Sequence, residues 1–442
     1  MPVEAMVIVV VATALVFDFT NGFHDSANAM ATAVSTGAYR PKRAVLLAAI
    51  MNLVGACLST EVAKTISSGI VDDRLVTPET VFAALVGAIL WNLFTWLLGL
   101  PSSSSHAMFG ALIGAVLVQA GSAGVHGAVV VSKILLPALV APVVAGLASY
   151  LSTRLAYGLV CNHHKGAKKR FRHAQQASSL LVALAHGTSD GQKTMGVITL
   201  VLVAATLQDP GQRHWWAQDP GTGPHWWVIA SAGLAIALGT YSGGWRIMRT
   251  MGKGMADIEP IQGFAAETSA MASILASSHF GFGLSTTHVV SGAVMGTGLA
   301  RTPGEVRWGT AGRMGVGWLM TLPAAGLIGA GAALLAHQGM WGFVTVLLVL
   351  AAAAGSIRYL AAGNHVSPEN VNDSHEVRVF GKATEPPSTP PSQGALATPL
   401  AGSLPAGITA EHPAAATPLA LTRLKPPKKK RKVRRDAGAG QP

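Results

Sequence analysis

The sequence predicts an all-α membrane protein with roughly ten to twelve membrane segments, arranged as two inverted-topology repeats. Half of its 442 residues are hydrophobic and 12% are charged, whereas charged residues make up about a quarter of an average soluble domain. Apolar stretches of spanning length recur, for example residues 3–17, 44–58, 81–100 and 341–357. A water-soluble fold is therefore not expected, and long apolar segments favour a helical bundle over a β-barrel.

The elements follow in a simple order along the chain. Residues 1–160 form the first predicted transmembrane repeat, and residues 161–174 form a short basic linker of the kind that stays cytoplasmic. Residues 175–337 form the second repeat, and residues 338–361 an extra C-terminal transmembrane helix. Residues 362–442 are rich in Pro, Ala, Ser and Thr and poor in aromatic residues, so we expect a disordered basic tail.

Charge and cysteine content exclude several classes of function. From Arg423 onward, nine basic residues and one acidic residue supply +8 of the net charge of +12, so the rest of the chain is close to neutral. The run at residues 427–433 has the pattern of a nuclear import signal, but in a multi-span protein it is better explained as a solvated tail near lipid head groups. Cys57 and Cys161 give neither a disulfide framework nor a thiolate metal site. We expect no nucleic-acid partner.

Three segments of the first half recur in the same order in the second half. This shared order indicates a duplication, and duplicated halves of transporters often insert with opposite topology around a site at the membrane midplane; two parallel repeats are the alternative. Inversion requires an odd number of crossings in each half, which places the N-terminus outside. The matched segments are 21–30 with 186–195, 64–72 with 249–257, and 104–111 with 286–293.

Two aspartates are the first candidates for chemistry. Asp25 and Asp190 occupy equivalent positions in the first matched pair, which we expect at the ends of apolar helices, beside glycines that let the backbone break. A lone Asp would be expected only to cap a helix at the water interface, but a matched pair at membrane depth favours a functional role. Asn28 and Lys193 are also equivalent. We expect these four residues to bind a small cation or to take up a proton.

The second candidates are hydroxyl groups at the starts of two apolar helices. Ordinary capping needs one hydroxyl, whereas runs of Ser and Thr occur at both equivalent places, which indicates an oxyanion site. His106 and His288 follow these runs, and because a buried neutral His is common we expect only a supporting or gating role for them. The residues predicted to bind the anion are Ser104, Ser105, Thr286 and Thr287.

The chain resembles the inorganic phosphate transporter (PiT) family over roughly residues 5–335. Residues 21–28 and 187–193, which we call the first and second signature segments, are similar to the two family signatures, and each is followed by a Ser/Thr-Thr-His-type element. The resemblance implies an inverted repeat with broken helices and hairpins, phosphate held between hydroxyl-rich helix ends, and cations held by the signature aspartates. Glu267 falls where family members carry an important glutamate, so the resemblance implies that it takes part in cation or proton coupling. Asn21 is expected to support the site.

The departures from the family pattern bear on which ion is coupled to transport. Sodium-coupled members carry Asn-Asp in both signatures, whereas this chain has His24-Asp25 and Ser189-Asp190, and Lys193 replaces the second signature asparagine. A buried ammonium could take the place of sodium. The pattern resembles the bacterial, proton-coupled, low-affinity type that accepts metal–phosphate complexes.

The resulting expectation is a secondary active transporter, not an enzyme, in the bacterial inner (cell) membrane. It would import inorganic phosphate with protons, without a resident cofactor or metal site, and with Mg²⁺ or another divalent metal travelling with the phosphate. The other expected partner is the lipid bilayer, and a homodimer is compatible with such a carrier. Alternatives are a sulfate carrier, a sodium-coupled phosphate carrier of the same fold, and a non-transporting sensor. A membrane enzyme is disfavoured because no nucleophile with an ordered base occurs.

Overall fold

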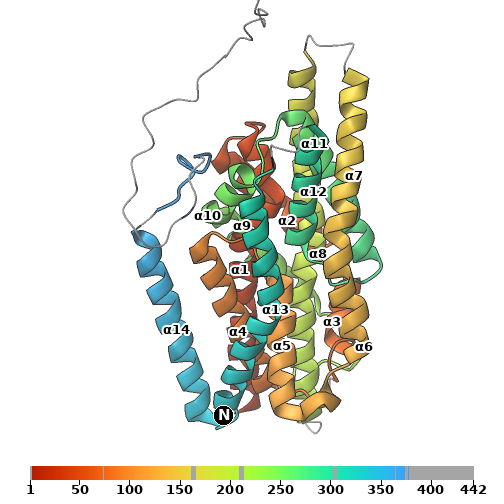
Figure 1. Cartoon of the computed structure of the whole chain (residues 1–442). Helices are drawn as coiled ribbons and strands as arrows, with labels where there is room; N and C mark the ends of the chain where they lie inside the picture. Colours follow the sequence, from red (N-terminus) through yellow and green to blue (C-terminus); the bar gives the residue numbers. More distant parts are fainter. Residues whose placement is uncertain are drawn as a thin grey trace, which may run out of the picture. The chain divides into compact units, whose positions relative to one another are not determined.

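The computed structural model describes residues 2–72, 74–160, 166–208, 214–301, 306–363, 365–373 and 377. These residues all belong to one unit, residues 1–382, whereas residues 383–442 form a second unit outside the described part. The described chain is almost entirely helical, and its extended backbone pairs only in two isolated bridges, Val71 with Val125 and Ala256 with Val306. The prediction of an all-α fold is confirmed for these residues (Figure 1).

The first half of the chain begins with a helix of 33 residues and the second half with one of 42. The helices of the first half are α1 (Val3–Ser35), α2 (Pro41–Ala56), α3 (Glu61–Ser68), α4 (Pro78–Leu98), α5 (Ser104–Ala120), α6 (Gly127–Val129), the π-helix η2 (Val130–Leu135) and α7 (Leu136–Val160). Those that follow are α8 (Ala167–Gln208), α9 (Trp226–Ser242), α10 (Trp245–Arg249), the π-helix η3 (Thr250–Gly254), α11 (Pro260–His279), α12 (Thr286–Arg301), α13 (Trp308–Ala336) and α14 (Met340–Ala362).

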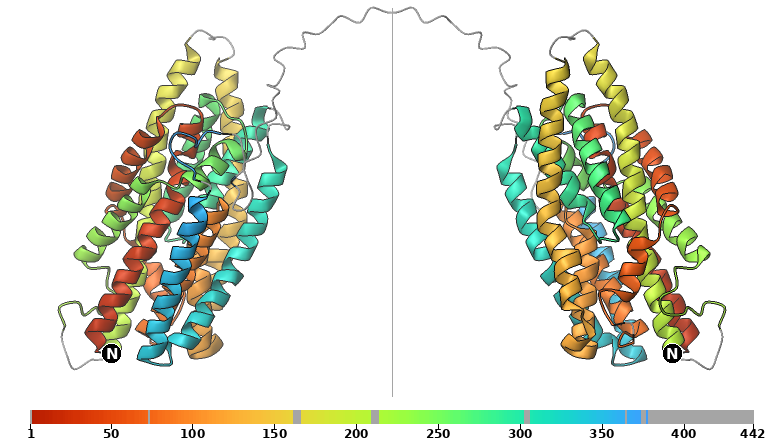
Figure 2. Two further views of the ribbon diagram at one scale, coloured as in Figure 1. Left: turned by 90° about the vertical axis from the view of Figure 1, so that its left-hand side faces the viewer. Right: turned by 90° about the vertical axis from the view of Figure 1, so that its right-hand side faces the viewer.

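Helices α4 and α5 form one hairpin and α11 and α12 form another. Both first helices begin with a proline at the first position, where its missing N–H costs nothing. Helix α4 ends at Gly99, whose φ of 65° is the left-handed conformation that glycine adopts most readily. In Figure 1, α4 and α5 lie in the lower part of the bundle and α11 and α12 in the upper part, and Figure 2 shows the same division from the sides.

Helices of each half pack against helices of the other half, and the pairs are equivalent. Helix α1 packs on α9 while its counterpart α8 packs on α2, and α5 packs on α13 while α12 packs on α7. Glycines make these crossings close: a Cβ atom on Gly22 would overlap the carbonyl oxygen of Ile236, and one on Gly187 would overlap that of Asn52. The duplication read from the sequence is thus accompanied by equivalent backbone contacts in both halves.

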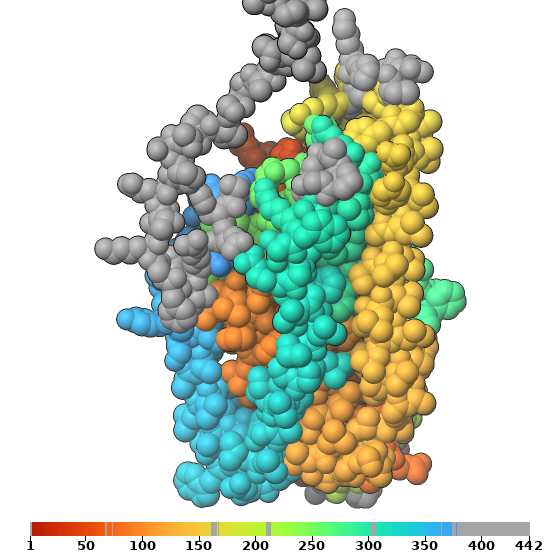
Figure 3. Space-filling model, in the orientation of Figure 1, coloured from red at the N-terminus to blue at the C-terminus, as the bar shows by residue number. Residues whose placement is uncertain are grey.

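Six helical segments in the described residues are long and apolar enough to cross a membrane, or seven if the pair α9 and α10–η3, bent by 60°, counts as one span. This is fewer than the ten to twelve membrane segments expected from the sequence; other helices, such as α2, α8 and α12, are shorter or more polar. Large apolar side chains are exposed along α7, α13 and α14, which share one face of the molecule in Figure 3. Exposed apolar side chains of this kind are suited to contact with lipid.

Two predicted boundaries differ from the structure. Helix α8 starts at Ala167, so residues 167–174 of the predicted linker are helical, and residues 161–165 lie outside the described part. Disorder was predicted from residue 362, whereas the structure describes residues 365–373 in contact with the helices. Val371 is buried there, and Asn372 donates a hydrogen bond to the carbonyl oxygen of Val34 at 3.4 Å. Composition suggested disorder, but the segment also pairs with Lys42 through Glu369 and accepts a hydrogen bond from Arg249 at the carbonyl oxygen of Asn370.

Candidate functional site

Both signature segments lie within long, continuous helices. Asp25 is buried inside α1 and Asp190 inside α8, so the prediction that they lie at helix ends is wrong. The adjacent glycines, Gly22 and Gly187, do not break the backbone but permit the close crossings with α9 and α2. The breaks lie instead in the two hairpins, whose turns bring the hydroxyl-bearing helix starts against α1 and α8.

In the first half, the carboxylate of Asp25 is held by two donors. The hydroxyl of Ser104, at the start of α5, donates to its Oδ2 at 2.6 Å. The imidazole Nδ1 of His24 lies 2.6 Å from its Oδ1. On the other side of that ring, Nε2 lies 3.2 Å from the hydroxyl of Thr95 and 3.3 Å from that of Ser102. A chain of polar contacts therefore links Asp25 to both ends of the α4–α5 turn.

In the second half, the carboxylate of Asp190 faces a built-in cation. The ammonium of Lys193 lies 2.6 Å from Oδ1 of Asp190 and 3.1 Å from the carbonyl oxygen of Leu284, and it also donates to the hydroxyl of Ser105. Thr286, at the start of α12, donates to Oδ2 of Asp190 at 3.4 Å. Lys193 is thus surrounded by carboxylate, carbonyl and hydroxyl oxygens, a ligand set that small hard cations prefer.

Side chains of both halves meet at four hydroxyl groups, which we call the hydroxyl cluster. These belong to Ser104, Ser105, Thr286 and Thr287. The amide of Asn28 donates to Thr287 at 2.9 Å and to Thr286 at 3.2 Å, while its counterpart Lys193 reaches Ser105. Each signature segment therefore binds the hairpin of the opposite half. The structure brings eight predicted residues together in one buried site: Asp25, Asn28, Ser104, Ser105, Asp190, Lys193, Thr286 and Thr287.

Several groups in the site could hold a cation. Asp25, His186 and Asp190 each offer one ligand atom, and these three atoms lie within 4.8 Å of one another. In addition, the amide oxygen of Asn28 is buried without a hydrogen-bond partner among the described residues. The sequence analysis assigned no metal ligands and passed over His186, although it aligns with Asn21 at the start of the matched segments. That alignment was the available signal.

Glu267 lies in a separate network between α11 and two other helices. Its carboxylate accepts hydrogen bonds from Thr32 at 2.6 Å and Gln175 at 3.0 Å, and from Ser178. The supporting residues are nearer the cluster. The rings of His106 and His288, one residue beyond the hydroxyl pairs, have centroids 4.9 Å apart, and Asn21 is buried on α1.

Asp18 is a further buried acid that the sequence analysis missed. It lies two turns before Asp25 on α1 and is fully buried. Neither carboxyl oxygen has a hydrogen bond of normal geometry within the described chain, with Thr194 and Asn21 as nearby side chains. An ionised carboxylate without partners is costly at this depth. Asp18 directly follows the apolar run of residues 3–17, and an acidic residue at that place was the signal that could have revealed it.

Comparison with known proteins shows the family of the chain. A profile of the phosphate transporter family matches residues 21–169 and 159–329, which together cover more than half of the chain. The chain belongs to this family. Probable low-affinity inorganic phosphate transporters of Mycobacterium leprae and Bacillus subtilis are 49% and 41% identical to it, over 84% and 74% of this chain and 88% and 95% of theirs.

A solved structure, a sodium-dependent phosphate transporter, shares the fold with a TM-score of 0.65 at 24% identity, covering 74% of this chain and 98% of the other. Membership of a transporter family rules out the enzyme alternative. Together with the spanning helices, it makes the chain a membrane protein.

Proposed function

We propose that this family member imports inorganic phosphate across the bacterial inner membrane together with protons. The observation that carries the proposal is the buried crossover, in which hydroxyl groups from two hairpins face two carboxylates and a lysine. Hydroxyl donors and a buried ammonium suit a tetrahedral oxyanion. The M. leprae and B. subtilis relatives, named as phosphate transporters, support phosphate as that anion.

The hydrogen bonds of Asp25 suggest how protons and phosphate are linked. Ser104 donates its hydroxyl hydrogen to the carboxylate of Asp25, so that donor is already in use. A protonated carboxyl is a weaker acceptor than a carboxylate, because charge-assisted hydrogen bonds are roughly twice as strong as neutral ones. Protonation of Asp25 would therefore release Ser104 toward phosphate. By linkage, bound phosphate would favour the protonated acid to the same extent.

Lys193 supports proton coupling over sodium coupling. Its ammonium lies among the oxygens of Asp190, Ser105 and Leu284, where a sodium ion would otherwise find ligands. A second cation approaching to about 4 Å would be repelled by about 4 kcal/mol at an effective dielectric of 20. Asp18, buried without partners of normal geometry, is a second candidate proton carrier in this region.

Charge balance favours a metal–phosphate complex as cargo. Moving a dianionic phosphate inward costs about 4.6 kcal/mol per 100 mV of negative-inside potential, twice the value for one charge. Free phosphate would therefore need at least three positive charges to be driven inward by voltage, whereas a neutral pair with Mg²⁺ or a similar divalent metal needs one. Asp25, which has no lysine beside it, would contact that metal while the hydroxyl cluster holds the phosphate.

We further propose an inverted repeat whose basic end faces the cytoplasm. The loop that follows α1 meets the first turns of α8, since the hydroxyl of Tyr39 donates to the carbonyl oxygen of Gln176. Exposed basic residues gather at this end, as the positive-inside rule requires of a cytoplasmic face. The loop between α8 and α9, which carries Trp215 and Trp216, contacts the start of α1 through His214 and Glu4, so it would face outward. The basic residues are Arg40, Lys42, Arg43, Lys168, Lys169, Arg170 and Arg172. A homodimer could form on the exposed apolar side chains of α7, α13 and α14.

The test is uptake of radiolabelled phosphate into proteoliposomes with an imposed pH gradient, with and without sodium, Mg²⁺ and competing sulfate. We expect uptake that follows the pH gradient, rises with Mg²⁺ and persists without sodium. It should also resist a roughly tenfold excess of sulfate, which corresponds to a preference for phosphate of more than about 1.4 kcal/mol. Full competition by sulfate would identify a sulfate carrier, and uptake that follows the sodium gradient would identify a sodium-coupled one. No uptake of either anion would support the sensor.

A further inference from the structure

The two hairpins have equivalent glycines at their tips. The first tip is residues 99–103, between α4 and α5, and the second tip is residues 280–285, between α11 and α12. Gly99 and Gly281 precede Ser104 and Thr286 at the same spacing, and their φ angles are 65° and 66°. Because a left-handed φ of this size favours glycine, the chain turns in the same way at both tips.

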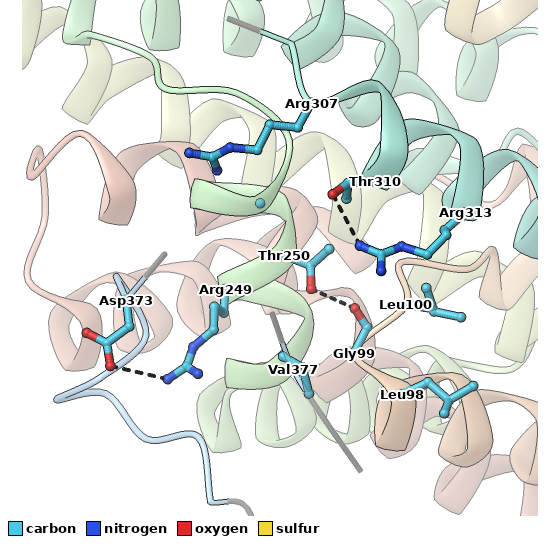
Figure 4. Close-up of a pocket in the computed structure, with 11 residues that line it drawn as sticks. Leu98, Gly99, Leu100, Arg249, Thr250, Arg307, Thr310, Arg313, Asp373 and Val377 are labelled. Atoms are coloured by element: carbon cyan, nitrogen blue, oxygen red, sulfur yellow. Dashed lines mark hydrogen bonds and ion pairs between the residues drawn. The ribbon is translucent and has the colours of Figure 1, made fainter. Parts of the chain in front are cut away.

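The first tip is held by a threonine of the other half. The hydroxyl of Thr250, at the start of η3, donates to the carbonyl oxygen of Gly99 at 2.7 Å, as Figure 4 shows. The indole of Trp318, on α13, donates to the carbonyl oxygen of Pro101 at 3.0 Å. Two carbonyl oxygens of the first tip are therefore bonded to helices outside the hairpin.

The second tip lies against the equivalent threonine but lacks the equivalent hydrogen bond. Thr65 of α3 matches Thr250 in the repeated segments. A Cβ atom on Gly281 would lie 2.9 Å from the hydroxyl oxygen of Thr65, so the two residues are in contact. That hydroxyl instead donates within its own helix, to the carbonyl oxygen of Glu61 at 3.3 Å. Among the described residues, no side chain donates to the carbonyl oxygen of Gly281.

Other side chains contact the second tip away from α3. The ammonium of Lys133, in η2, lies 4.1 Å from the centre of the Phe282 ring, and that of Lys193 donates to the carbonyl oxygen of Leu284. Neither contact uses the carbonyl oxygen of Gly281. A small movement of the second tip could therefore bring this acceptor to Thr65 and reproduce the bond seen in the other half.

Each tip lies between the central site and one of the two threonines. Ser102 in the first tip contacts His24, and Leu284 in the second tip contacts Lys193. In Figure 1, α10, which continues into η3, lies in the upper part of the bundle, and α3 lies in the lower part. A tip that leaves its threonine would therefore uncover the site toward one end only, the basic end for the first tip and the opposite end for the second.

We propose that Thr250 and Thr65 are a matched pair of gating residues that bond the two tips in alternate states. Thr250 bonds the first tip when the basic end is closed, as in this structure. Thr65 bonds the second tip when the opposite end is closed and the first tip is released. Two duplicated halves that move around one site need such a contact in each half, and a bond present in only one state biases the equilibrium toward that state.

The first experiment rests on the proposed function, because it uses phosphate as cargo. The apparent affinity for phosphate is measured from each side, in right-side-out and in inside-out membrane vesicles. Each affinity depends on the fraction of carriers open to that side, so their ratio reports the equilibrium between the states. Thr250→Val and Thr65→Val remove the hydroxyl, and Thr250→Ser and Thr65→Ser keep it. The control is Thr268→Val, since the hydroxyl of Thr268 bonds only within α11 in the described structure.

We expect the two valine variants to shift the affinity ratio in opposite directions. Thr250→Val should favour the state open to the basic end, and Thr65→Val the state open to the opposite end, each by roughly fivefold for the loss of one hydrogen bond. The serine variants and Thr268→Val should keep the wild-type ratio. A purely structural role would weaken binding from both sides alike, and an unchanged ratio in both valine variants would overturn the proposal.

A second measurement needs no transport. Backbone hydrogen exchange of the full-length protein in nanodiscs is followed at both tips without phosphate. In the wild type the first tip should exchange more slowly than the second. Thr250→Val should speed exchange at the first tip and slow it at the second, where the Thr65 bond becomes more populated. Unchanged exchange at the second tip would refute the alternation, whereas vesicles without phosphate uptake would refute only the proposed function.

Discussion

The two halves of the central site share one frame but differ in charge. In both, a hydroxyl at the start of the second helix of a hairpin donates to a signature aspartate, Ser104 to Asp25 and Thr286 to Asp190. In the second half Lys193 neutralises Asp190 at 2.6 Å, whereas in the first half the equivalent residue is Asn28, which is uncharged. Symmetry therefore fixes where the groups lie, and the difference suggests that a mobile cation acts mainly in the first half.

The largest effect is expected from Asp25→Asn. This variant should lose coupled phosphate uptake, because the amide cannot exchange a proton, and it should remain in the membrane at normal levels, because Asn still accepts the hydrogen bond from Ser104. Radiolabelled uptake and immunoblotting of membranes check both statements. Near-normal uptake would show that Asp25 does not carry the coupling cation.

Asp190→Asn should also abolish uptake, but for a different reason. It leaves the ammonium of Lys193 buried without its carboxylate partner, and breaking a buried ion pair costs about 3–5 kcal/mol. We expect a lower thermal midpoint than that of Asp25→Asn in detergent, and recovery of the midpoint in Asp190→Asn/Lys193→Met. Equal thermal stability of the two single variants would contradict the asymmetry between the halves.

Lys193→Asn should make the second half resemble the first. Without the ammonium, the oxygens of Asp190, Ser105 and Leu284 become available to an external cation. We expect uptake to become sodium-dependent, since repulsion of about 4 kcal/mol at 4 Å and an effective dielectric of 20 is removed. Uptake by the variant is measured in sodium and in choline buffers. A sodium-independent variant would imply that Lys193 does not occupy a cation position.

The smallest effect is expected from single alanine substitutions in the hydroxyl cluster. Ser105→Ala and Thr287→Ala each remove one donor to the anion, which corresponds to about 1 kcal/mol or roughly a fivefold weaker apparent affinity. Protein levels should change little. The concentration dependence of uptake provides the measurement, with Thr345→Ala, an exposed hydroxyl on α14, as the matched control. An unchanged concentration dependence would place the phosphate elsewhere.

Much of the central site could be predicted because duplication marks it twice. Asp25 and Asp190, or Ser105 and Thr287, attract attention only as pairs, and the structure brings both pairs together. His186 and Asp18 have no matching acid or imidazole in the other half, so the same comparison passed over them. Their roles depend on which helices cross, and a sequence pattern does not show crossings.

Hydropathy was enough to predict the membrane helices, whereas features that depend on close packing could not be predicted. Glycines beside Asp25 and Asp190 suggested helix breaks, yet Gly22 and Gly187 serve close crossings in unbroken helices. Likewise, the composition after residue 362 suggested disorder, but Val371 is buried and Asp373 faces Arg249.

The most direct test of the account compares the wild type with Asp25→Asn in sodium-free proteoliposomes. Each is loaded with phosphate and assayed for net uptake under an inside-alkaline pH gradient and for exchange of internal against external phosphate without a gradient. The account predicts that the gradient drives accumulation by the wild type only, while Asp25→Asn retains exchange. Gradient-driven accumulation by Asp25→Asn at the wild-type rate would contradict it.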